Sequence, residues 1–295
     1  MIGVVACEAL YNAVGRLAPD ATVRYVPPDR HEFPVNVPDE TAVASALQRR
    51  IDAVDDPALD RIVVAYADDG ESLVGLRSAH APLVVARSTD CISTFLPAEP
   101  SNAGSDAASN GTSNAASNGT PKTASDAAGV AAGERKAPGT YYLSRGWIDC
   151  AVDACKLHAA YTGTERELLE PLERAAAAHP DMRVTWNEGP LYERALEARE
   201  GVGPDQIGRF VHRIVRYYDT VALLDTGDLY EAHREYAERF RAFVERLSRE
   251  HGDGHRVELA TVDADHALLR TLLRPDPDAV ASDRVESYPP GSPVR

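Results

Sequence analysis

The sequence predicts an α/β protein with a mainly parallel sheet covered by helices on both faces, in Rossmann-like layers. Two patterns lead to this fold class. Short continuous apolar runs, typical of strands buried on both faces, alternate with segments of helical periodicity. The segment 39–54, for example, repeats Val43, Leu47 and Ile51 on one helix face. No Gly-x-Gly-x-x-Gly follows a predicted strand, so the layers carry no dinucleotide-binding fingerprint.

The first part of the chain, residues 1–97, contains the N-terminal half of the predicted domain. The apolar runs and the turn residues between them define its elements. Strands are predicted at Ile2–Cys7, Thr22–Val26, Arg61–Tyr66 and Leu83–Arg87, and helices at 8–17 and 39–54.

Residues 98–138 interrupt this pattern. The segment consists mostly of Ala, Ser, Asn, Gly and Thr, and Ala-Ala-Ser-Asn-Gly-Thr occurs at 107–112 and again at 115–120. Such a composition offers too little apolar surface to offset the entropy lost on ordering. We therefore predict a disordered insertion, which one domain accommodates at little cost.

Residues 139–273 are predicted to form a helical lobe and the C-terminal half of the same α/β domain. The remaining segment, 274–295, is rich in Pro, Asp and Ser, and we expect an irregular tail. Helices are predicted at 148–161, 165–178, 189–200, 204–217, 230–250 and 265–273, and strands at 220–224 and 256–262.

The charge composition excludes several classes of partner. Asp and Glu number 46 against 31 Lys and Arg, for a net charge of -15, and only Lys122, Lys136 and Lys156 are lysines. This balance is typical of a salt-adapted host, so we expect a halophilic source. A nucleic acid or an anionic membrane surface is not expected to bind. Neither a transmembrane run nor a secretory signal is recognised, so the expected location is the cytoplasm.

Polar side chains follow consecutive predicted strands. Cys7 and Glu8 end the first, His31 follows the second, Asp68-Asp69 the third and Cys91 the fourth, and Asp225 and Asp228 follow the strand 220–224. In one open parallel sheet these positions share the carboxyl edge, where ligands bind. Thiolate, imidazole and carboxylate together favour zinc or iron. On these residues alone, packing of the buried cysteines is the simpler interpretation.

Several sequence motifs resemble the family called domain of unknown function 1638. They are Cys7-Glu8, His31, Tyr66-Ala67-Asp68-Asp69-Gly70, Pro82–Ile92, Gly139–Trp147 and Tyr288-Pro289-Pro290-Gly291. The chain departs from the family pattern at Asp69, where cysteine is usual, and at Thr89, where histidine is common. The resemblance implies a one-carbon or corrinoid-linked role, and it favours Cys7, His31, Asp69 and Cys91 as metal ligands. Carboxylate at position 69 hardens such a site, or else this branch has lost it.

Other side chains have candidate roles beside the metal. Glu8 or Asp90 would act as acid and base or would support a ligand, and Arg87 would anchor an anionic substrate group. Trp147 would form a wall of the pocket. Each has a structural alternative: a salt bridge between Arg87 and Asp90, and core packing for Trp147.

Three functions follow as hypotheses. The leading one is a cytoplasmic protein with a zinc or iron site that acts on a small molecule in one-carbon or corrinoid-linked metabolism. The second is a metal-free accessory protein that binds a methyltransferase or corrinoid partner. The third is a thiol enzyme with Cys91 as nucleophile and His31 as base. Whether the protein is an enzyme is left open.

Overall fold

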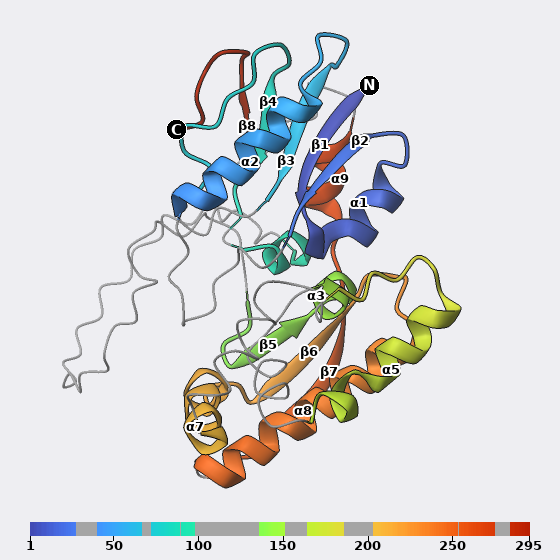
Figure 1. Cartoon of the computed structure of the whole chain (residues 1–295), viewed down its shortest axis with the longest axis vertical. Coiled ribbons are helices and arrows are strands. Elements are labelled where there is room, and N and C mark those ends of the chain that lie inside the picture. Colours follow the sequence, from blue (N-terminus) through green and yellow to red (C-terminus); the bar gives the residue numbers. More distant parts are fainter. Residues whose placement is uncertain are drawn as a thin grey trace, which may run out of the picture.

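The computed structural model contains two parallel sheets, each in its own lobe (Figure 1). The residues that it describes are 1–27, 40–66, 72–88, 90–97, 136–150, 164–185, 203–252, 254–274 and 284–295. The first sheet has the order β2-β1-β3-β4-β8, and the second has the order β5-β6-β7. All neighbouring strands are parallel except β4 and β8.

The first lobe is built around a five-stranded sheet whose central strands are mostly apolar. Its strands are β1 (Ile2–Cys7), β2 (Thr22–Val26), β3 (Arg61–Ala65), β4 (Leu83–Ala86) and β8 (Val285–Tyr288). Helix α2 (Glu40–Val54) packs against β1 and β2, while α1 (Tyr11–Leu17) and α9 (Ala267–Leu273) lie on the other face (Figure 1). Every residue of β3 and β4 is buried, as expected of strands covered on both sides.

The second lobe carries the shorter sheet and the longest helix. Its strands are β5 (Thr140–Leu143), β6 (Thr220–Asp225) and β7 (Glu258–Asp263). Helix α8 (Glu231–His251) packs on β6 and β7, and α5 (Glu165–Ala178) and α7 (Pro204–Val215) pack on α8. Short α3 (Arg145–Cys150) follows β5 and lies where the lobes meet (Figure 1).

The separation into two sheets corrects the sequence prediction. We expected the strands near 220–224 and 256–262 to complete the first sheet, but they are β6 and β7 of the second. Asp225 therefore does not share an edge with Cys7 and Cys91. A buried apolar strand such as Val221–Leu224 carries no information about which sheet it joins, because both sheets bury such strands alike.

The C-terminal segment also differs from the prediction. Residues 274–295 were expected to be irregular, but β8 pairs antiparallel with β4 over Val285–Tyr288. Beyond it, the backbone N–H of Val294 donates to Leu76 and its carbonyl accepts from Gly75. Unlike β4, which has the same length, the segment Val-Glu-Ser-Tyr has no continuous apolar run, so this strand is recognised only beside its partner.

The other predicted elements agree with the structure where it describes them. Strands β1 and β2 and helix α5 have the predicted bounds, and the remaining elements differ by one to three residues at their ends. The predicted helix at 189–200, most of the helix at 148–161 and residues 98–135 of the predicted insertion lie outside the described residues. Among the described helices, none is both long and apolar enough to cross a membrane.

Candidate functional site

Four neighbouring strands of the first sheet precede the four proposed metal ligands. Because β2, β1, β3 and β4 are parallel and adjacent in that order, their carboxyl ends meet at one edge. Cys7 ends β1 and Cys91 follows β4, and both are buried. His31 and Asp69 follow β2 and β3 in the chain and lie outside the described residues. Within the described part of the chain, no three His, Cys, Asp or Glu side chains form a group that could hold a metal ion.

The two carboxylates predicted for acid and base roles have different surroundings. Glu8 begins the 3-10 helix η1 (Glu8–Leu10), and its Oε1 accepts a hydrogen bond from Nη1 of Arg183 at 3.2 Å. Asp90 forms an ion pair with Lys136 and accepts hydrogen bonds from the backbone N–H and the hydroxyl of Ser93. Glu8 thus faces the second lobe, whereas the Asp90 carboxylate binds the first turn of the short 3-10 helix η3 (Ile92–Phe95) through Ser93.

Arg87 and Trp147 are also placed by the structure. Arg87 forms an ion pair with Glu286 of β8, and among the described contacts Asp90 pairs with Lys136 and not, as predicted, with Arg87. Trp147, on α3, is partly buried and packs against the hydrophobic clusters of both lobes. The structure therefore brings Glu8 and Trp147 to the boundary between the lobes and places Arg87 beside the far edge of the first sheet.

The lobes touch most closely where α3 meets η1. Gly146 lies against the backbone of Ala9, so that a Cβ on Gly146 would stand 2.6 Å from the carbonyl carbon of Ala9 and nearer still to its oxygen. Ordinary contacts of a Cβ begin at about 3.4 Å. Only glycine allows this approach, and it holds Arg145 and Trp147 at the boundary with the first lobe.

Arg145 is the central cation of this boundary. Its side chain is 3% exposed, and its guanidinium lies 2.8 Å from Oδ2 of Asp181 and 3.5 Å from the carboxylates of Asp149 and Asp228. It also donates to the backbone carbonyl of Asp228 at 2.9 Å. A buried guanidinium is stable only when carboxylates compensate its charge, and three of them do so here. The hydrogen bond from Arg145 holds the pKa of Asp181 below its ordinary value.

Asp149 links the lobes beneath this cation. It is completely buried, and its Oδ2 accepts a 2.7 Å hydrogen bond from the phenol of Tyr11 in the first lobe. Its Oδ1 lies 3.0 Å from Nε2 of His233, which is also completely buried. Nδ1 of His233 accepts the backbone N–H of Tyr230, so in the neutral ring Nε2 carries the proton and donates to Asp149.

A pocket of about 550 Å³ opens over this network. Both lobes contribute to its lining, chiefly through Tyr11, Arg16, Tyr25, Asp181, Arg183 and Asp228. The guanidinium of Arg183 lies over the rings of Tyr11 and Tyr25, with 5.3 and 4.9 Å to the centroids. Arg16 donates to the carbonyl of Thr226 at 2.6 Å. The side chains of Arg16 and Arg183 remain 40% and 45% exposed, so part of each guanidinium faces the pocket.

The chemistry available in the pocket is hydrogen bonding and charge recognition. Burial, together with the nearby Asp149 carboxylate, raises the pKa of Tyr11 and keeps its phenol protonated. Asp181 is ionised because its pKa is lowered. Guanidinium and phenol groups donate, while the Asp181 and Asp228 carboxylates accept. The pocket therefore suits a small polar ligand that carries an anionic group and hydrogen-bond donors.

Sequence reasoning missed most of this pocket. Tyr11, Arg145, Asp149 and His233 were not singled out, and Asp228 was expected at the carboxyl edge of one sheet together with Cys7 and Cys91. Tyr11 and Asp149 are 138 positions apart in the chain, and no local pattern pairs residues at such a separation. One local signal was present, because Arg145 and Gly146 belong to the motif Gly139–Trp147 that supports the family resemblance.

The comparisons with known proteins identify one family. Residues 39–112 match the family described as Protein of unknown function (DUF1638). The chain resembles that family over this range. The range begins just before α2 and includes Asp69, Arg87, Asp90 and Cys91, but neither Cys7 nor His31. No curated protein and no solved structure matched the chain.

Proposed function

We propose that the protein binds a small, anionic, polar molecule in the pocket between its lobes. The observation that carries this proposal is that the carboxyl ends of both parallel sheets face the same boundary. After the carboxyl end of β1, η1 contacts α3. After β6, Thr226 and Asp228 accept hydrogen bonds from side chains of α1. After β7, the backbone N–H of Asp265 donates to the carbonyl of Phe95. Ligands of open α/β sheets bind outside the carboxyl ends of the strands, so each lobe supplies half of a site.

The order of the first sheet supports a Rossmann-like layering within this proposal. In the order β2-β1-β3-β4, the chain moves to one side of β1 with β2 and to the other side with β3. The crevice between the ends of β1 and β3 is then the topological switch point. Cys7 and Glu8 lie at this crevice, and Glu8 contacts Arg183 of the pocket.

The arginines of the pocket provide a test of ligand binding. A panel of small carboxylates and phosphates would be screened by thermal shift, and hits would be measured by calorimetry. Replacement of both flexible cations, R16Q/R183Q, should weaken binding at least about ten-fold, because it removes charge-assisted hydrogen bonds. The exposed R174Q provides a matched control in the second lobe. Equal binding by R16Q/R183Q and wild type would refute the proposal.

A zinc or iron site is the second candidate function, and the strand order favours it. The four strands that precede Cys7, His31, Asp69 and Cys91 are neighbours, and both described cysteines are at the appropriate edge. Their thiols fit a zinc or iron site in donor type, with His31 and Asp69 as the further ligands. A bound metal would lower the pKa of water or a thiol. Glu8 would then be the nearby acid and base, next to the ligand pocket.

Metal analysis separates this candidate from the alternatives. The protein would be purified anaerobically, and its zinc and iron would be measured beside C7A/C91A and the control C150A, which alters a buried cysteine of the second lobe. About one metal per chain, lost only in C7A/C91A, would support the site. Without metal, stoichiometric alkylation of Cys91 would favour the thiol enzyme, and capture of a methyltransferase or corrinoid protein would favour the accessory role. The one-carbon or corrinoid link rests on the family resemblance.

A further inference from the structure

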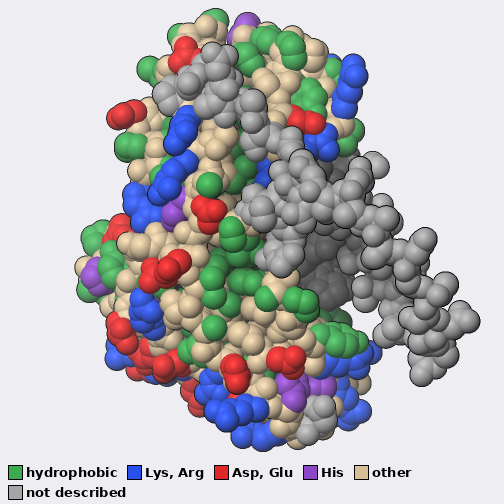
Figure 2. Space-filling view, turned by 180° about the vertical axis from the view of Figure 1, so that it is seen from behind, with side chains coloured by type: hydrophobic (Ala, Val, Ile, Leu, Met, Phe, Trp, Pro, Cys, Tyr) green, Lys and Arg blue, Asp and Glu red, His purple; other side chains and the backbone are tan. Residues whose placement is uncertain are grey.

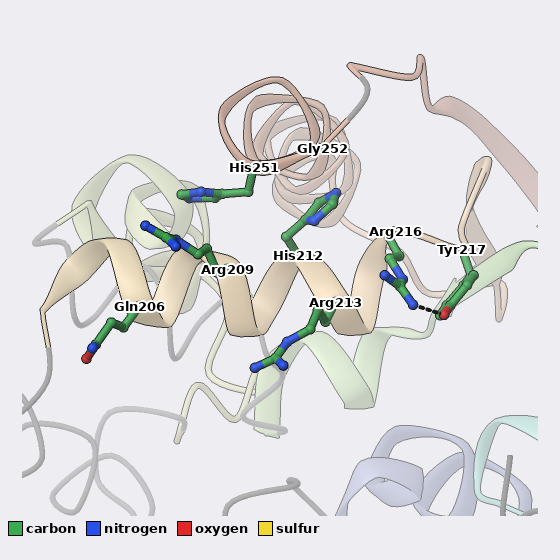
Figure 3. A pocket seen from close by; sticks show the side chains of 8 residues that line it. All are labelled: Gln206, Arg209, His212, Arg213, Arg216, Tyr217, His251 and Gly252. Atoms are coloured by element: carbon green, nitrogen blue, oxygen red, sulfur yellow. Dashed lines mark hydrogen bonds between the residues drawn. The ribbon is translucent and has the colours of Figure 1, made fainter. Parts of the chain in front are cut away.

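A stripe of basic side chains runs along one helix at the far end of the second lobe. Arg209, His212, Arg213 and Arg216 occupy positions i, i+3, i+4 and i+7 of α7 and its C-terminal end, which places them along one side of the helix. With His251 and Gly252 from the end of α8 they line a pocket of about 710 Å³ (Figure 3). Arg and His side chains gather at this end of the molecule (Figure 2).

Two glycines leave room for the imidazole rings of this pocket. A Cβ on Gly208 of α7 would lie 3.0 and 3.1 Å from Cδ2 and Cε1 of His251, and a Cβ on Gly252 would lie 2.5 Å from Cε1 of His212. Each histidine thus lies directly on the backbone of the opposite helix. The His251 side chain is only 10% exposed, and His212 is 8% exposed. The two rings form the floor of the pocket.

The arginines above this floor differ in their partners. Arg209 pairs with Asp205, and His251 lies 3.8 Å from Asp205 and 3.9 Å from Glu250. Arg216 lies over the ring of Tyr217 and donates to its hydroxyl, and Arg213 lies over Phe210. Among the described residues, neither Arg213 nor Arg216 forms a salt bridge. In a chain of net charge -15, these guanidinium groups are a local excess of positive charge.

We propose that this pocket binds a ligand with linked phosphate groups, such as a diphosphate or triphosphate. Planar guanidinium groups bind phosphate oxygens in a bidentate manner, and several of them on one helix match several phosphates. The site is separate from the pocket between the lobes. His233 and His251 are 18 positions apart on α8, which corresponds to roughly 27 Å along the helix. Basic residues near the ends of α7 and α8 also stabilise the helix dipoles, but that role alone predicts no phosphate binding.

Titration with inorganic tripolyphosphate tests the proposal. Calorimetry at low ionic strength should show saturable binding to the full chain, weakened by added KCl. R213Q/R216Q should reduce the affinity at least about ten-fold. The matched control R24Q/R49Q removes two exposed arginines of the first lobe and should bind like wild type. Unfolding curves of both variants would verify that they are folded.

Two results would overturn the assignment. One is the absence of saturable binding to the wild-type protein. The other is an equal loss of affinity in R24Q/R49Q and R213Q/R216Q, which would show that tripolyphosphate responds to overall charge and not to this pocket.

Discussion

The close contact between Gly146 and Ala9 predicts opposite effects of one substitution at two glycines. Gly146→Ala should destabilise the protein, because the new Cβ would meet the Ala9 carbonyl across the boundary of the lobes. Gly15→Ala is the control in neighbouring α1. A Cβ there has no atom within 4 Å, and alanine favours a helix over glycine.

The expected loss of stability in Gly146→Ala follows from the distances at this contact. To bring the Cβ from 2.6 Å to an ordinary 3.4 Å from the Ala9 carbonyl carbon, α3 and η1 must separate by at least about 1 Å, and by more to clear the nearer carbonyl oxygen. Overpacking of this kind costs about 1–3 kcal/mol. The separation also stretches the 2.7 Å hydrogen bond from Tyr11 to Asp149, which contributes about 1.5–3 kcal/mol as a bond to a charged group. We expect a loss of about 3 kcal/mol for Gly146→Ala, and a gain of up to about 1 kcal/mol for Gly15→Ala.

Urea denaturation and thermal melting of both variants would measure these changes. A loss of about 3 kcal/mol lowers the melting temperature by roughly 6–12 °C in a protein of this size, whereas Gly15→Ala should leave it unchanged or raise it slightly. If Gly146→Ala melted like wild type, the close approach of the lobes would be wrong. If both variants lost the same stability, the effect would come from the type of substitution and not from the contact.

Two further predictions concern buried polar groups at the same boundary. Asp149→Asn should cost about 3 kcal/mol in urea denaturation, the lower end for breaking a buried pair, because two other carboxylates still compensate Arg145. The ion pair between Glu170 and Arg239 at the surface provides a comparison, and Glu170→Gln should cost less than about 1 kcal/mol. Similar losses of stability in the two variants would contradict the buried network. Burial, with help from nearby arginines, lowers the pKa of His266 below 6.5. As the pH falls, His266 therefore binds a proton at a higher pH in the unfolded chain than in the folded protein. The free energy of unfolding should therefore decrease below pH 6.5, and less steeply in His266→Gln; parallel pH profiles would exclude this residue as a source of the decrease.

Most helices and strands could be predicted from the sequence because each has a strong local pattern. The apolar runs at β1 and β3 and the periodic face of α2 lie in continuous stretches of sequence. Strands β5 and β8 have four residues each, and they depend on partners far along the chain. The number of sheets was not predictable either, because it depends on which strands pair and not on how each strand is composed.

The candidate site was only partly predictable for the same reason. Cys7 and Glu8 follow a strand, so their place at its carboxyl end follows from the sequence alone. Asp149 and His233 become a pair only because β5, β6 and α8 bring them together, and a lone histidine in an apolar helix face usually indicates packing. The ion pair between Arg87 and Glu286 could not be predicted either, because Glu286 lies in strand β8, which the sequence did not predict.

The path of the chain through the two lobes determines the order in which they can be completed during synthesis. The strands of the second lobe lie in one continuous stretch, from β5 to β7, whereas the first lobe takes strands from before and after that stretch. Helix α9 and strand β8 leave the ribosome after β7, so β4 remains an open edge when the strands of the second lobe have already been made. Domains usually finish from the N-terminus onward, and open edges invite pairing with other chains. In this protein the lobe whose strands come first is completed after the second lobe, and the segment 284–295 closes its exposed edge.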